Sequence, residues 1–203
     1  MSTASVVNIC NMALGWIGGD RITSLGDDST RANLCNLNYP RSRDVVLEAR
    51  EWTFAVKHQL LSPDAAAPSN PEYGQRFFIP TDILRVLTVH QPVDFGADQL
   101  TAGLIQAEQI PWVREGRYIL CNFDEVSMRG IQRIESTGEF SESFVHALSA
   151  RLAADLAIPL TESKELQQQM YSLYLEKLDD ASATDGMQGR SQRIRSRYLQ
   201  SRR

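Results

Sequence analysis

The positions of the prolines divide this chain of 203 residues into three parts. Because proline lacks an amide donor and clashes with the preceding helical turn, a cluster of prolines excludes long helices. Six of the eight prolines fall between residues 52 and 137, at Pro63, Pro68, Pro71, Pro80, Pro92 and Pro111. The sequence therefore predicts helices before and after this stretch, and a different structure within it.

The first part, residues 5–51, carries two helical patterns. Apolar residues recur at steps of three and four from Ser5 to Ile17, and Gly18 with Gly19 then ends this helix. A second helix is expected from the capping residues Asp27-Asp28-Ser29 to about Arg50. Since Pro40 lies inside it and removes one hydrogen bond, we expect a kink or a helix in two pieces.

Two more helices are predicted over residues 141–181. Ser141 is a good N-cap for the third helix, and Pro159 is expected to end it. Thr161 is the predicted cap of the fourth helix, whose apolar stripe continues to Ala181.

The middle part, residues 52–137, has the composition of short strands. Turn-forming Glu115-Gly116 precedes one of them, the run Arg117–Phe123. Trp52, at the start of the middle part, is interpreted as a core residue rather than a base-stacking platform. The β-rich runs are Arg76–Ile79, Ile83–Val89, Arg117–Phe123 and Val126–Ile134. The predicted fold class is α+β, mainly α: about four helices in a bundle, an inserted small antiparallel β region and an extended C-terminal arm. Residues 1–183 would form one domain.

The last part, residues 184–203, reads as a flexible basic arm behind a glycine-containing hinge. The last fifteen residues contain six arginines and no acidic residue. Residues 1–188, in contrast, hold 15 basic and 25 acidic residues, a net charge of −10. Apolar residues lie among the arginines, which favours a docking arm over a solubilising tail, although charge alone leaves protein, RNA and DNA as partners. The predicted docking residues are Arg190, Arg193, Ile194, Arg195, Arg197, Tyr198, Leu199, Arg202 and Arg203.

Motifs for catalysis, cofactors and metals are not found in the sequence. No phosphate-binding loop, CxxC, HExxH or Gly-x-Ser-x-Gly occurs. Its three cysteines are interpreted as buried thiols of a protein made in a reducing cytoplasm, and its three histidines as surface or half-buried residues. We therefore expect no enzyme, no cofactor and no metal. Without a run of about 18 apolar residues, no membrane span is expected either.

Three segments, in order, resemble one family. The stretch from Asn11 to Lys57 contains N-x-A-L-G-W-I-G, then I-T-S-L-G-D-D-S-T-R-A, then Y-P-R-S-R-D-V-V-L-E-A-R-E-W-T-F-A-V-K. The middle piece F-I-P-T-D-I-L-R-V covers residues 78–86, and the third spans Phe144 to Thr161 with its Ala-Leu pairs. Together they resemble podophage tail tubular protein A, the head-to-tail adaptor or gatekeeper of short-tailed phages, over roughly residues 8–183.

The resemblance implies a non-enzymatic virion protein of the tail or neck. It implies a ring, usually of twelve copies, between the portal protein and the tail nozzle protein, with helices lining the channel used in DNA ejection. Genomic DNA would pass without sequence-specific binding, and the arm would reach toward the portal. The alternative reading is a helical nucleic-acid-binding protein that grips phosphates with its arginine-rich arm.

Overall fold

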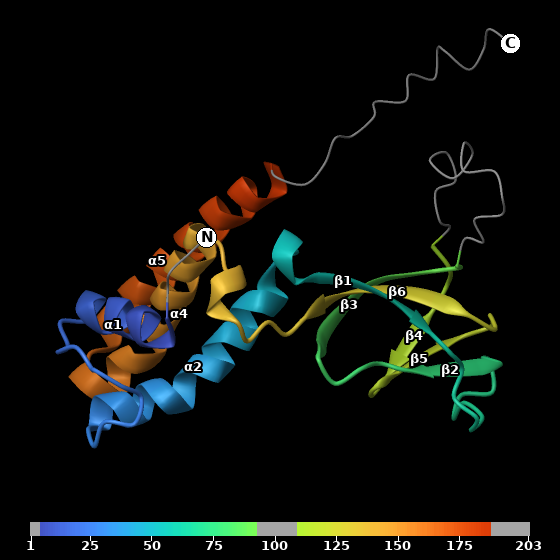
Figure 1. Cartoon of the computed structure of the whole chain (residues 1–203), viewed down its shortest axis with the longest axis horizontal. Coiled ribbons are helices and arrows are strands. Elements are labelled where there is room, and N and C mark those ends of the chain that lie inside the picture. The colour runs from blue at the N-terminus through green and yellow to red at the C-terminus, as the bar shows by residue number, and fades with distance from the viewer. Residues whose placement is uncertain (1–4, 93–108, 188–203) are drawn as a thin grey trace, which may run out of the picture.

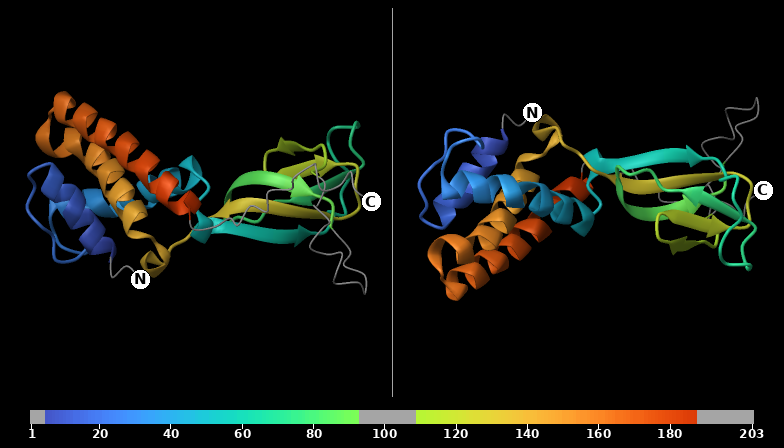
Figure 2. Two further views of the ribbon diagram at one scale, coloured as in Figure 1. Left: turned by 90° about the horizontal axis from the view of Figure 1, so that it is seen from above. Right: turned by 90° about the horizontal axis from the view of Figure 1, so that it is seen from below.

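A computed structural model describes residues 5–92 and 109–187 of the chain (Figure 1). Four helices form one end of the molecule, which we call the helical bundle, and six strands form the other, which we call the β module (Figures 1 and 2). The helices are α1 (Val6–Trp16), α2 (Thr30–Ala49), α4 (Glu142–Thr161) and α5 (Lys164–Met187). The fold is α+β and mainly α, with the β module inserted between α2 and α4, as the sequence predicts.

Helix α4 is the centre of the bundle, because α1, α2 and α5 all pack against it. Small and apolar residues alternate around α4, and its Ser149 hydroxyl donates to the Ile9 carbonyl of α1 at 3.4 Å. Leu148, Leu152 and Leu156 are completely buried in the core that the four helices share. The predicted apolar stripe of this helix is therefore the inner surface of the bundle.

Serine side chains cap the N-termini of α1, α2 and α4. The hydroxyls of Ser5, Ser29 and Ser141 accept from the amides of Asn8, Ala32 and Phe144. Each bond satisfies an amide that has no partner within its helix. After α1, Gly18 adopts a φ of +74°, the left-handed conformation expected there.

Neither internal proline interrupts its helix. Helix α2 is continuous across Pro40, so the two-piece alternative is wrong. Helix α4 passes through Pro159 and ends at Thr161, because Glu162 takes the left-handed cap position and donates its amide to the Ile158 carbonyl at 2.9 Å. Thr161 is thus not the cap of α5; that role belongs to the Ser163 hydroxyl, which accepts from the Leu166 amide at 3.1 Å.

Helix α5 is longer than predicted. It continues beyond Ala181 to Met187, so residues 183–187 are helical rather than part of a flexible hinge. Helix α5 runs without a break across the boundary predicted between residues 183 and 184, and the side chain of Asp185 is buried.

The β module contains two antiparallel sheets instead of the single small sheet predicted. One has the order β1-β6-β3 and the other β2-β5-β4. Strands β1 and β4 were not among the predicted runs. Glu115 is the last residue of β4, and the turn Gly116-Arg117, with Gly116 at a φ of +57°, joins β4 to β5. The bounds are β1 (Val56–Leu61), β2 (Gln75–Phe78), β3 (Ile83–His90), β4 (Val113–Glu115), β5 (Tyr118–Cys121) and β6 (Val126–Gln132).

A second core lies between the two sheets. Phe77 of β2, Ile119 of β5 and Met128 of β6 are completely buried within it. Where β6 pairs with β3 in the first sheet, a Cβ on Gly130 would lie 2.9 Å from the Arg85 carbonyl oxygen. Glycine is therefore required for these two strands to approach so closely.

Candidate functional site

The nine docking residues predicted in the arm, Arg190 to Arg203, lie outside the described residues. The structure does describe the root of the arm, which is the last turn of α5, residues 182–187. This turn lies beside the waist, our name for the two chain segments that join the bundle to the β module, residues 50–56 and 132–141 (Figure 2). The waist and the arm root together form the candidate site.

Asp185 fixes the arm root to the waist. Its carboxylate accepts a hydrogen bond from the Thr53 amide at 2.7 Å and another from the Thr53 hydroxyl at 2.8 Å. The residue is only 4% exposed, and it is the one acid among the buried polar residues of the described chain. A buried carboxylate needs such partners, because leaving it without them forfeits its hydration.

The 3-10 turn η1 (Thr53–Ala55), in which Thr53 lies, rests on a cluster of aromatic rings. Trp52 is completely buried and donates its indole N–H to the Val46 carbonyl at 2.9 Å. Phe144 packs edge-on against Trp52 and Phe54, with ring centroids 5.0 and 5.2 Å apart. The interpretation of Trp52 as a core residue is confirmed, and the backbone of Thr53 has a rigid support.

Ion pairs surround this contact. Arg50 reaches Asp179 of α5 at 2.6 Å, and Glu51 accepts from Arg129 of β6 at 2.8 Å. In α2 itself, the Asp44 carboxylate lies between the guanidinium groups of Arg43 and of Arg133 from the waist, at 2.8 and 2.9 Å. Charged side chains thus link α2 to both α5 and the β module.

Sequence reasoning missed the pairing of Asp185 with Thr53. Gly186 and Gly189 suggested a hinge, yet the spacing of the buried residues Tyr174, Leu178, Ala181 and Asp185 continues the helical stripe by one more turn. The sequence signal that could have indicated this contact is the position of Asp185, which falls where the apolar stripe of the helix would place its next buried residue.

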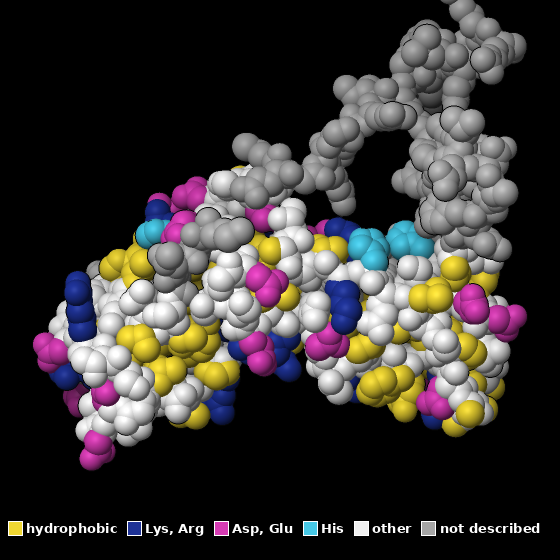
Figure 3. Space-filling model, viewed as in Figure 1, with side chains coloured by type: hydrophobic (Ala, Val, Ile, Leu, Met, Phe, Trp, Pro, Cys, Tyr) yellow, Lys and Arg dark blue, Asp and Glu magenta, His cyan; other side chains and the backbone are white. Residues whose placement is uncertain are grey.

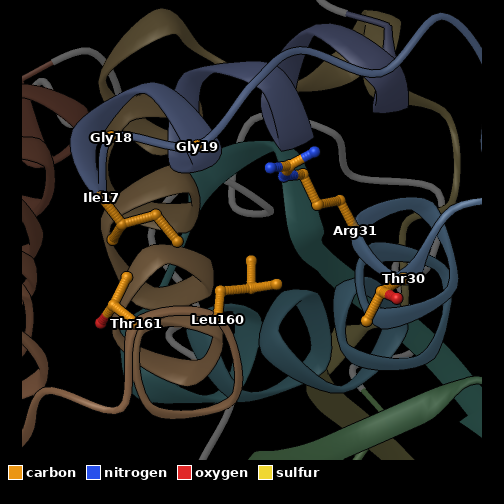
Figure 4. A pocket seen from close by; sticks show the side chains of 7 residues that line it. All are labelled: Ile17, Gly18, Gly19, Thr30, Arg31, Leu160 and Thr161. Carbon is orange, nitrogen blue, oxygen red and sulfur yellow. The ribbon is translucent and has the colours of Figure 1, made fainter.

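Two hollows lie on the bundle away from the waist. One, of about 320 Å³, is lined by residues at the ends of α1 and α4 and the start of α2 (Figure 4). Its Arg31 is paired with Asp20 at 2.9 Å. The other, of about 480 Å³, runs between α4 and α5 and includes Arg151 and Tyr171. In neither lining set is a nucleophile paired with a base.

The cysteines are buried and free of disulfides, as expected. A hydrogen bond with Cys35, together with burial, raises the pKa of the Cys10 thiol far above its ordinary value. Burial also raises the pKa of Cys121. A thiol held in its protonated form is a poor nucleophile and a poor metal ligand.

Among residues 5–92 and 109–187, no group of three or more His, Cys, Asp or Glu side chains could hold a metal ion. The same ranges contain no helix with the length and hydropathy needed to cross a membrane. No protein-family model and no curated protein sequence matches the chain.

Proposed function

We propose that this chain is a structural head-to-tail adaptor of a short-tailed bacteriophage. In this proposal, copies of the chain form a ring between the portal protein and the tail nozzle protein. The ring lines the channel for genomic DNA, and the arm beyond residue 187 docks on the portal. The chain would be made in the host cytoplasm and would work in the virion without catalysing a reaction.

The observation that carries the proposal is the structural role of polar residues within the resembling segments. The Asn11 side chain accepts from the amide of Ile22 at 2.8 Å and donates to its carbonyl at 2.9 Å. Asp82 of the second segment binds the Lys57 ammonium of the first at 2.9 Å. Within the segments that resemble the family, Asn11 thus fixes a loop, and Lys57 with Asp82 joins the first segment to the second. Such structural roles support a resemblance in fold.

Asp27 holds the loop before α2 in the same way. Its carboxylate accepts from the amides of Thr23 and Ser24, at 2.8 and 3.1 Å. Hydrogen bonds from Ser24 and then Thr23 hold the pKa of Asp27 below its usual value. This aspartate lies inside the I-T-S-L-G-D-D-S-T-R-A motif, so the motif describes a loop with a defined conformation.

The shape of the molecule suits a ring subunit. On the face shown in Figure 3, hydrophobic side chains gather over the bundle and again over the β module. Leu37 and Val45 are exposed on α2, while Phe78 and Val113 are exposed on the second sheet. Exposed apolar groups at both ends supply two regions for contacts with neighbouring proteins.

The charge of the body suits a DNA channel. Residues 1–188 carry a net charge of −10, and a wall that repels phosphates lets DNA slide. A wall rich in lysine and arginine would hold the duplex through phosphate contacts.

Measurement of mass in solution tests the proposal. The chain is measured alone, with its cognate portal ring, and with duplex DNA at several salt concentrations. A ring, or a ring that forms only on the portal, is the expected result. A monomer that ignores the portal and binds DNA with a steep salt dependence would instead establish the nucleic-acid-binding alternative.

Truncation after Met187 tests the arm. This cut keeps Asp185 and its bonds to Thr53, so we expect the shortened body to fold with unchanged stability. Loss of portal attachment is expected, because the arginine-rich segment is gone. Undiminished attachment by the shortened chain would show that the arm is dispensable.

A further inference from the structure

The last turn of α5 is weak by composition. It contains Gly186, and glycine inside a helix is less favourable than alanine by roughly 1 kcal/mol. A Cβ on Gly186 would meet nothing within 4 Å, so no close packing explains the glycine. The residues beside it, Ala183 and Thr184, are exposed. The turn therefore depends on contacts made by few side chains.

Asp185 supplies the contact that ties this turn to the waist. Both of its carboxylate oxygens are bonded to Thr53, one to the amide and one to the hydroxyl. Arg50 and Asp179 form an exposed pair six residues earlier along α5, beside Leu178 of the bundle core. Unwinding the last turn would separate Asp185 from Thr53 without disturbing Tyr174 or Leu178 in the core.

Thr53 belongs to the path that leads into the β module. It begins η1, and β1 follows directly at Val56. The Thr53 amide points at Asp185, while the Ala55 amide bonds the Trp52 carbonyl at 3.0 Å. Loss of the aspartate would leave the amide of Thr53 without this acceptor at the first residue of the turn.

We propose that Asp185 and Thr53 form a latch that links the reach of the arm to the order of the waist. In the closed state, α5 is helical to Met187 and η1 is held. In the open state, residues 182–187 unwind and η1 loses its acceptor. Extension of six residues from a helical rise of about 1.5 Å to about 3.3 Å lengthens the reach of the arm by roughly 11 Å.

The latch has a consequence for assembly, which rests on the proposed adaptor function. A partner that draws the arm away from the body favours the open state and loosens the start of the β module. By thermodynamic reciprocity, a neighbour that holds η1 in place favours the closed state and a short arm. Attachment at the arm and contact at the β module are thereby coupled through one carboxylate.

Amide hydrogen exchange on the full-length chain, resolved to single residues, tests this coupling. Thr53→Val removes the hydroxyl donor and keeps the amide, while Asp185→Asn removes the charge. We expect Thr53→Val to speed exchange at residues 184–187 about five- to thirtyfold, because it removes one hydrogen bond to a charged group. Asp185→Asn should speed exchange at Thr53 by a similar factor. Asp180→Asn, an exposed acid on the same helix, is the matched control and should change neither segment.

Gly186→Ala provides a second experiment, because alanine strengthens the helix at this position without steric conflict. It should slow exchange at residues 184–187 and also at Thr53, and it should reverse part of the effect of Thr53→Val. If Gly186→Ala protects the helix but leaves Thr53 unchanged, the two segments are not coupled and the latch is wrong. The same conclusion follows if Thr53→Val leaves residues 184–187 unchanged.

These measurements need neither portal nor DNA. A coupled response in a chain that forms no ring would leave the latch standing and remove the adaptor function. If the chain forms a ring but its two segments exchange independently, the adaptor function stands and the latch is wrong.

Discussion

The helical bundle and the β module bring their elements together in different ways. In the bundle, the buried surface of α4 is rich in small residues, including Ala147, Ala150 and Ala153, and three helices pack around it. In the β module, large side chains such as Phe77 and Met128 fill the space between two sheets, and Gly130 permits the close pairing of β3 with β6. The same kind of substitution should therefore have different consequences in the two regions.

The largest effects are expected from truncating one buried ring in each core. Phe144→Ala in the bundle and Phe77→Ala in the β module each remove a completely buried ring and should cost about 3–5 kcal/mol of unfolding free energy. Because the two cores are separate clusters, Phe77→Ala should unfold the β module at a lower denaturant concentration than the bundle. Hydrogen exchange at increasing urea, followed at Met128 and Leu148, measures the two transitions.

Phe78→Ala is the control for this experiment. Phe78 neighbours Phe77 in β2 but is 47% exposed, and its ring contact is with Tyr118. The expected loss is about 1 kcal/mol or less. A single shared transition in Phe77→Ala would mean that the two regions unfold as one unit.

Replacing glycine by alanine should have opposite signs in the two regions. Gly130→Ala in β6 places a methyl group 2.9 Å from the Arg85 carbonyl oxygen, and we expect a loss of about 1–3 kcal/mol. Gly15→Ala in α1 meets no atom within 4 Å and should gain roughly 0.5–1 kcal/mol. Chemical denaturation of each variant measures both values. Equal and small effects would show that β3 and β6 can move apart at no cost.

The smallest effect concerns ion pairs. The hydrogen bond from Lys57 holds the pKa of Asp82 below its usual value. A lowered folded-state pKa adds stability above the unfolded value of about 3.9, and that stability is lost as the pH falls through the folded value. Asp82→Asn should thus cost roughly 0.2–1 kcal/mol at pH 7 and nothing in strong acid.

The matched pair in the bundle is Arg31 with Asp20, whose carboxylate side chain is 82% exposed. Asp20→Asn should leave the denaturation midpoint unchanged at either pH, because solvent screens such a pair. A loss in Asp82→Asn that persists undiminished in acid would assign the effect to packing rather than to charge.

Local signals in the sequence predicted the parts of the fold that local interactions determine. Ser29 and Ser141 cap their helices through bonds to residues three positions away, and Gly18 ends the first helix by its own conformation. Strand β1 escaped prediction because its centre, Lys57-His58-Gln59, is polar and its pairing is with β6, about seventy residues later. The prediction that Pro159 ends its helix was also wrong, because the helix gains further hydrogen bonds beyond it, from the Glu162 amide and the Thr161 hydroxyl.

The candidate site was the least predictable part, because its contact joins residues 132 positions apart. The composition of residues 183–189 indicated a hinge. The hydrogen bonds of Asp185 to Thr53, which hold residues 183–187 as a helix, become visible only in the three-dimensional structure. The arm residues predicted to dock, from Arg190 onward, stay a prediction, as do the portal, the nozzle and the ring.

Insertion of the β module between α2 and α4 also sets the order in which the chain can fold. Each strand pairs within residues 56–132, so the module has all its partners before α4 is synthesised. The carbonyl of Ile9 in α1 gains its contact with the Ser149 hydroxyl only after α4 is made, 140 residues later. Helices α1 and α2 leave the ribosome before α4, so they complete their packing only after α4 is made, and their apolar stripes need protection until then.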